Sequence, residues 1–213
     1  MAEITISTQH GNQPLRHVVQ HECGHAAVSW ALDVPFARIV VDSPLGPHVV
    51  PDTNVGSVLA GLDWIIRASG FIADYQSRGY KMRGSQIARM VLGGDSDRFE
   101  VDDAITGAVA VRPSRLPAVQ PGMNGRPAGD LHGMAAEFGR RPRAEVTPEV
   151  IRFWRACEAY TAELRPAIDA LAEAVLDRGD LPYTDAADIA TAAMLGHPMP
   201  VLAGWLREEL GMR

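Results

Sequence analysis

Long stretches of the chain carry apolar residues at helical spacing and contain few helix breakers. The first runs from Pro14 to Leu32, is interrupted only by Gly24, and ends at Asp33 and Pro35. A later stretch has an inward stripe that comprises Ile151, Trp154, Leu164, Ile168, Leu171 and Val175. We predict helices over residues 14–32, 59–79, 86–92, 97–111, 148–178 and 201–210, with a short one from residue 184.

Two short stretches between the first helices favour strands. Residues 36–41 are rich in β-branched side chains and are bounded by prolines. Residues 54–58 form a second candidate strand. The prediction is a mainly α fold of the α+β class, with a small β-sheet or hairpin and helices at its C-terminal end.

The length of 213 residues suits a single domain over residues 1–213. Residues 1–13 are polar, and we expect them to be a flexible N-terminus. Residues 112–147 are rich in proline, glycine and arginine, which predicts a long loop. A surface excursion is favoured for this loop over a lid that touches substrate. Residues 148–213 follow as C-terminal helices.

Composition excludes several classes of function. The net charge is -6 and the pI is about 5.6, so no basic surface for nucleic acid is expected. No apolar run is long enough for a membrane span, and the N-terminus lacks the pattern of a secretory signal. With only two cysteines, Cys23 and Cys157, a disulfide framework is not expected, and we predict a cytoplasmic location.

The first predicted helix carries His21, Glu22 and His25 in a His-Glu-x-x-His pattern. A spacing of four residues puts both imidazoles on one helix face, where they can bind one zinc ion. Glu22 is rotated by about 100° from His21, so its carboxylate can lie beside the metal. Zinc lowers the pKa of a bound water to near 7, and Glu22 can then take the proton of this water as general base. The pattern therefore predicts a zinc-dependent hydrolase of peptide bonds.

Two neighbours of this pattern are expected to have other roles. His17 lies eight residues before His25, about 12 Å along the helix axis, so one metal cannot bind both. We interpret His17 as a packing residue or as a support for a ligand. Cys23 points away from the zinc face and is interpreted as a buried thiol, with redox sensing as the minor alternative.

The segment HVVQHECGHAAVSWAL resembles the His-Glu-Ala-Gly-His-Ala segment of the FtsH-type zinc metallopeptidases, family M41. FARIVVDSP and NVGSV resemble the strands that follow it in this family. DWIIRASGFIADYQSRG resembles the second helix of the family, with Asp74 where a glutamate is usual, and AIDALAEAVLDRGDLPYTDAADI is similar to its closing helices. The resemblance covers mainly residues 14–111 and implies a helical, zincin-like metalloendopeptidase domain with Zn²⁺ as its cofactor.

The sequence departs from this family in three ways. It contains no Gly-x-x-x-x-Gly-Lys-Ser/Thr loop of an AAA ATPase and no membrane anchor, and Cys23 replaces the usual alanine. We therefore expect an endopeptidase that hydrolyses unfolded or flexible protein segments and is by itself independent of ATP. FtsH-type domains form hexameric rings, so a homo-oligomer and a separate ATPase partner both remain open.

The resemblance also implies that the third zinc ligand is an aspartate at the start of the helix after Gly94. The candidates are Asp95, Asp97, Asp102 and Asp103, of which the last three are compared by helical register. Only Asp97 is followed at helical spacing by a continuous stripe of apolar or small residues, which comprises Val101, Ala104, Ile105 and Ala108. Asp97 is therefore favoured as a metal ligand, although it also suits a helix N-cap paired with Glu100. Asp74 is the next candidate if all three fail.

Two other functions remain as alternatives. One is a dedicated regulatory protease that cleaves a single partner protein. The other is a catalytically silent, zinc-binding interaction domain, against which the presence of Glu22 argues. For the protease, the strand near Ile39 is expected to be the sheet edge on which an extended substrate docks.

Overall fold

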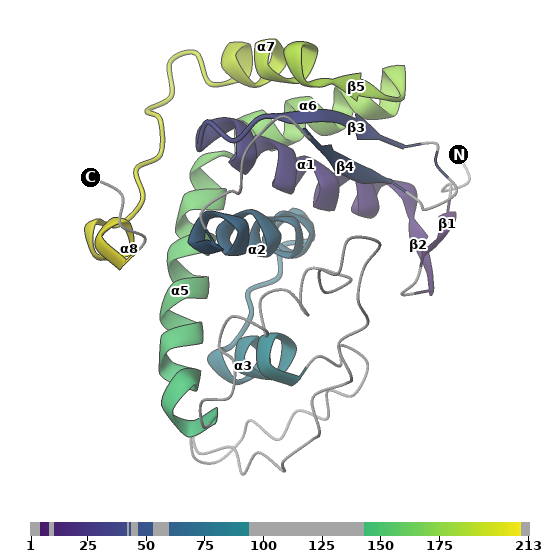
Figure 1. Cartoon of the computed structure of the whole chain (residues 1–213). Helices are drawn as coiled ribbons and strands as arrows, with labels where there is room; N and C mark the ends of the chain where they lie inside the picture. Colours follow the sequence, from purple (N-terminus) through teal and green to yellow (C-terminus); the bar gives the residue numbers. More distant parts are fainter. Residues whose placement is uncertain are drawn as a thin grey trace. The chain divides into compact units, whose positions relative to one another are not determined.

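The computed structural model describes residues 5–8, 11–41, 43, 47–52, 60–93 and 143–209, and helices make up most of these described residues. A three-stranded antiparallel sheet and a two-stranded hairpin accompany them (Figure 1). This confirms the predicted mainly α architecture with a small sheet. The chain divides into two compact units, one of Met1–Tyr80 with Ala156–Arg213 and one of Lys81–Arg155.

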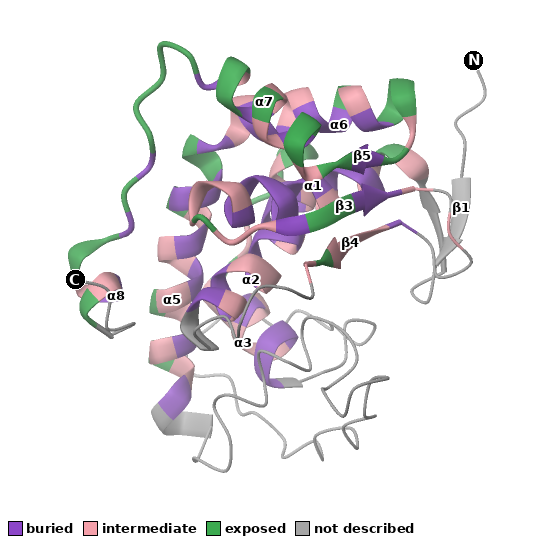
Figure 2. Cartoon of the chain, turned by 45° about the horizontal axis from the view of Figure 1, so that its top comes forward, coloured by how far each residue is buried: buried purple, intermediate pink, exposed green. Residues whose placement is uncertain are grey.

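Helix α1 (Leu15–Ala31) lies at the centre of the first unit. It contacts the helices α2 (Ala60–Ser77) and α6 (Arg165–Arg178) and the strands of the sheet. Its residues from Val18 to Ser29 are buried except for His21 and Glu22, which are partly exposed (Figure 2). The helix ends where Asp33 adopts a φ of 55°, a left-handed conformation that aspartate tolerates better than most residues.

Helices α1 and α2 approach closely because small residues meet at their crossing. A Cβ atom added to Gly24 would lie 2.6 Å from both Ala73 Cβ and the main-chain oxygen of Ser69. The Ser69 hydroxyl donates a hydrogen bond to the Gly24 carbonyl, with an Oγ–O distance of 3.1 Å. This contact fixes how α2 faces the histidines of α1.

The sheet consists of β3 (Phe36–Val40), β4 (His48–Pro51) and β5 (Leu181–Pro182) in the order β4-β3-β5. The strand near Ile39 is therefore central, and the prediction that it forms the docking edge is wrong. Ile39 pairs with Val49 on one side and with Leu181 on the other. The sequence could not reveal this because β5 is a two-residue strand far away in the chain. The predicted strand at residues 54–58 lies outside the described residues, and β4 comes before it.

The C-terminal helices differ from the prediction at two points. The helix expected over 148–178 is two helices, α5 (Arg143–Glu163) and α6, with the break at Leu164. Pro166 lies in the first turn of α6, where its missing N–H costs nothing. Helix α5 also begins at Arg143, within the segment expected to be a loop. Helices α7 (Tyr183–Ala193) and α8 (Gly204–Glu209) match the two predicted short helices.

The N-terminal stretch that was expected to be flexible contains a hairpin of β1 (Thr5–Thr8) and β2 (Gly11–Pro14). In the second unit, α3 (Gly84–Gly93) and the first part of α5 bury Ile87, Val150 and Trp154. The predicted helix over 97–111 and the loop residues 112–142 lie outside the described residues. No helix in the described part of the chain is long and apolar enough to cross a membrane.

Candidate metal centre

The side chains of His21, Glu22 and His25 lie together on α1. One ligand atom from each lies within 4.8 Å of the others, and no other described residues form such a group of three. The two imidazole rings meet edge to face, with centroids 4.7 Å apart. The helical spacing thus brings the three predicted residues together as expected, with His21 and Glu22 partly exposed and His25 buried.

Gly70 on α2 faces both histidines. A Cβ atom at this position would lie 2.5 Å from His25 Nε2 and 2.8 Å from His21 Nε2. Both Nε2 atoms therefore converge on a short stretch of α2 backbone that has no side chain. Phe71, the next residue, packs its ring edge to face against His21, with centroids 4.8 Å apart.

The other ring nitrogen of His25 is engaged with the backbone of α2. Its Nδ1 lies 2.6 Å from the carbonyl oxygen of Ile66. Because a carbonyl oxygen can only accept, Nδ1 must carry the proton and donate it. In the neutral imidazole this tautomer puts the lone pair on Nε2, and a histidine that ligates a metal through Nε2 usually donates from Nδ1 in this way.

Glu22 is held from the opposite direction by the sheet. Its Oε2 accepts a hydrogen bond from the main-chain N–H of Val49 on β4, at 3.1 Å. The carboxylate therefore lies between α1 and the edge of the sheet, within reach of the two imidazoles. This contact joins residues from two separate elements, and no local sequence pattern predicts it.

The donors of this group suit zinc. Neutral imidazole nitrogens are preferred zinc ligands, and a carboxylate is compatible with a metal ligand or with a base beside one. The absence of a side chain at Gly70 lets the two Nε2 atoms lie close to the same point of α2. The group could hold a metal ion, and its donor atoms are compatible with Zn²⁺, which His21 and His25 would hold.

The group of His21, Glu22 and His25 contains none of the aspartates predicted as a third ligand. Asp97, Asp102 and Asp103 all lie outside the described residues, so their roles stay predictions. Asp74, the reserve candidate, contacts His17 instead, with 3.4 Å between Oδ1 and Nδ1. It also pairs with Arg78. The structure thus places His17 beside Asp74 rather than in the group of His21, Glu22 and His25.

Cys23 lies on the buried side of α1. Burial raises the pKa of its thiol well above the usual value, and the nearby charges of Glu22 and Asp169 raise it further. The thiol therefore stays protonated, which makes it a poor metal ligand and a poor nucleophile. This agrees with a packing role and argues against redox sensing.

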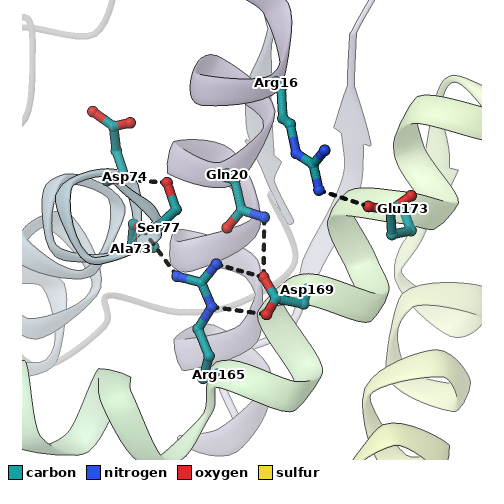
Figure 3. A network of polar contacts seen from close by, with 8 residues as sticks. All are labelled: Arg16, Gln20, Ala73, Asp74, Ser77, Arg165, Asp169 and Glu173. Carbon is teal, nitrogen blue, oxygen red and sulfur yellow. Dashed lines mark hydrogen bonds and ion pairs between the residues drawn. The ribbon is translucent and has the colours of Figure 1, made fainter. Parts of the chain in front are cut away.

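A polar network fastens α1 and α2 to α6 (Figure 3). Gln20, next to His21, donates from Nε2 to Asp169 Oδ1 at 3.1 Å. Arg165 pairs with the same carboxylate, with an Nη2–Oδ1 distance of 2.6 Å, and its Nη1 reaches the Ala73 carbonyl of α2 at 3.4 Å. Arg16 of α1 pairs with Glu173 of α6 at 3.0 Å. Sequence reasoning missed this network because all its contacts except Arg165–Asp169 join residues that lie far apart along the chain.

Comparisons with known proteins add no assignment: no family model matches the sequence, and no curated protein matches it.

Proposed function

We propose that the chain is a zinc-dependent endopeptidase that resembles the FtsH-type family M41 in its peptidase domain. The observation that carries this proposal is the convergence of two imidazole Nε2 atoms at Gly70, with the Glu22 carboxylate within 4.8 Å. A buried structural zinc site would not need an acid between the two histidines in sequence. A hydrolytic site needs a base beside the metal.

His21 and His25 would hold the zinc ion through Nε2, and the ion would lower the pKa of water at the site. Glu22 would accept a proton from the attacking water and later deliver it to the leaving amine. The Ile66 carbonyl orients the His25 ring, and Val49 positions the Glu22 carboxylate. Asp97 is the proposed third ligand, because in its predicted helix it shares a face with a stripe of apolar or small residues.

The edge of the sheet supports a polypeptide as substrate. Among the described strands, β4 is the outer one of the sheet, and it lies next to the site because Val49 contacts Glu22. An extended chain can add to such an edge through main-chain hydrogen bonds, which do not depend on side-chain identity. The proposed substrates are therefore unfolded or flexible protein segments, cleaved without ATP by this chain alone.

The test combines metal content with cleavage. The full chain, purified without chelator, should contain one zinc per molecule by elemental analysis and should cleave casein. Removing the metal with a chelator should abolish cleavage, and added zinc should restore it. His197→Ala is the matched control for His21→Ala, because His197 is exposed and lies in the segment after α7. A zinc-free protein, or equal zinc loss in both variants, would refute the proposal.

A further inference from the structure

The main-chain N–H of Val49 points out of the sheet, and the pairing of β3 with β5 explains why. Arg38 pairs with Pro182, and Ile39 pairs with Leu181. Proline has no N–H, so Arg38 and Pro182 form the non-hydrogen-bonded pair of this short ladder. The main-chain groups of Ile39 are therefore directed toward β5.

The same alternation decides the direction of Val49, which lies opposite Ile39 on β4. Because Ile39 directs its main-chain groups away from β4, Ile39 and Val49 form a non-hydrogen-bonded pair. The N–H and C=O of Val49 then point to the outer edge of β4. The 3.1 Å hydrogen bond from this N–H to Glu22 Oε2 is an independent observation with the same conclusion.

This donor is the main-chain group that an added strand would use. An extended chain on the outer edge of β4 pairs with residues whose N–H and C=O point outward, and Val49 is such a residue. The proposed general base therefore occupies the hydrogen-bonding position that a substrate strand needs. Glu22 Oε2 and a carbonyl oxygen of the substrate cannot both accept a hydrogen bond from the Val49 N–H in good geometry.

We propose that Val49 determines specificity by exchanging its hydrogen-bond partner on substrate binding, an inference that rests on the proposed function. A carbonyl oxygen of the extended substrate takes the Val49 N–H, and Glu22 Oε2 is released from this donor. An Oε2 that no longer accepts from the Val49 N–H can accept a hydrogen bond from the attacking water instead. The site thereby favours chains that can form a strand along β4 over small amides that cannot.

The first test removes the donor. Val49→Pro deletes the N–H, and proline is tolerated on an edge strand where the N–H points outward. We expect kcat/KM for casein to fall about five-fold, the effect of one lost main-chain hydrogen bond. For a furylacryloyl dipeptide amide, too short to pair along β4, kcat/KM should rise about five-fold. Val49→Ala changes the same side chain but keeps the N–H. The ratio of its kcat/KM for casein to its kcat/KM for the dipeptide amide should therefore equal the wild-type ratio.

If Val49→Pro does not fold, an ester in place of the 48–49 amide bond removes the N–H without restricting the backbone. A fall in kcat/KM for both substrates by the same factor would overturn the proposal, because Val49 would then only position Glu22. If wild-type protein cleaves neither substrate, the proposed function fails, and the exchange of partners is decided by the second test.

The second test needs no catalysis. Hydrogen exchange of the Val49 amide, followed by NMR, should be slow in the wild type and about ten-fold faster in Glu22→Ala, which lacks the acceptor. Adding excess casein to Glu22→Ala should restore slow exchange, since the substrate strand becomes the acceptor. Continued fast exchange at Val49 in the presence of casein would refute the partner exchange.

Discussion

Gly70 lies directly against His25, and a Cβ atom at Gly70 would be 2.5 Å from the Nε2 of that imidazole. The same atom would be 2.8 Å from His21 Nε2. The two nitrogens that would bind the metal thus share the space left by one missing side chain. A helix-interior glycine costs about 1 kcal/mol relative to alanine, and here the close approach of the two imidazoles is the reason for it.

Gly70→Ala should therefore weaken zinc binding. The new methyl group would displace both imidazoles, and we expect zinc affinity to fall by 10-fold or more, the loss typical when the orientation of ligands is disturbed. Competition with a chromogenic chelator measures this affinity. Gly204→Ala is the control, because a Cβ atom at Gly204 would meet nothing within 4 Å. Wild-type zinc affinity in Gly70→Ala would show that the metal does not bind at these nitrogens.

Glu22→Gln should retain zinc and fold but lose peptide cleavage. The amide oxygen of glutamine can still accept from the Val49 N–H, so the contact between α1 and β4 is preserved. The proton acceptor is lost, which typically lowers kcat by about 10² to 10⁴. Casein cleavage and zinc content, measured on the same preparation, check this. Undiminished cleavage would remove Glu22 from the mechanism.

Asp97→Ala should weaken zinc binding far more than Asp102→Ala or Asp103→Ala. The reason is the register of the predicted helix, since Asp102 and Asp103 are rotated about 140° and 240° from Asp97. Zinc content and affinity of the three variants, measured side by side, test this register. Loss of zinc in a neighbour but not in Asp97→Ala would mean that the helix begins later than predicted. Full zinc in all three would place the third ligand elsewhere.

The free energy of unfolding should fall at high pH because the buried phenol of Tyr160 loses its proton. Burial, and then the charges of Glu163 and Asp33, raise the pKa of this phenol to about 12. The unfolded chain, with a tyrosine pKa of about 10, loses its proton first, so this stabilising contribution is complete below about pH 10 and disappears as pH rises through 12. Urea unfolding across this range should show the free energy of unfolding falling more steeply for the wild type than for Tyr160→Phe. Tyr80→Phe, at an exposed position, is the control and should keep the wild-type slope.

The chemistry of the site could be predicted from local sequence. His21, Glu22 and His25 lie within five consecutive residues, and the helix period alone puts their side chains on neighbouring faces. The helical stretches from 14 to 32 and from 59 to 79 were also predictable from local sequence, because few helix breakers interrupt them. The start of α5 at Arg143 was missed because Pro148, which was interpreted as the opening of the helix, lies inside it. The break at Leu164 was missed because Pro166, in the first turn of α6, was not interpreted as the start of a new helix.

What surrounds the site was decided by tertiary structure. The closeness of Gly70 to His25, the Ile66 carbonyl at Nδ1 and the Val49 N–H at Glu22 each join elements that are separate along the chain. The central position of β3 likewise depends on β5, which is contributed from beyond residue 180. Local sequence determines which side chains share a helix face because the helix period is fixed. It cannot determine which backbone groups meet that face, because these contacts depend on how distant segments pack together.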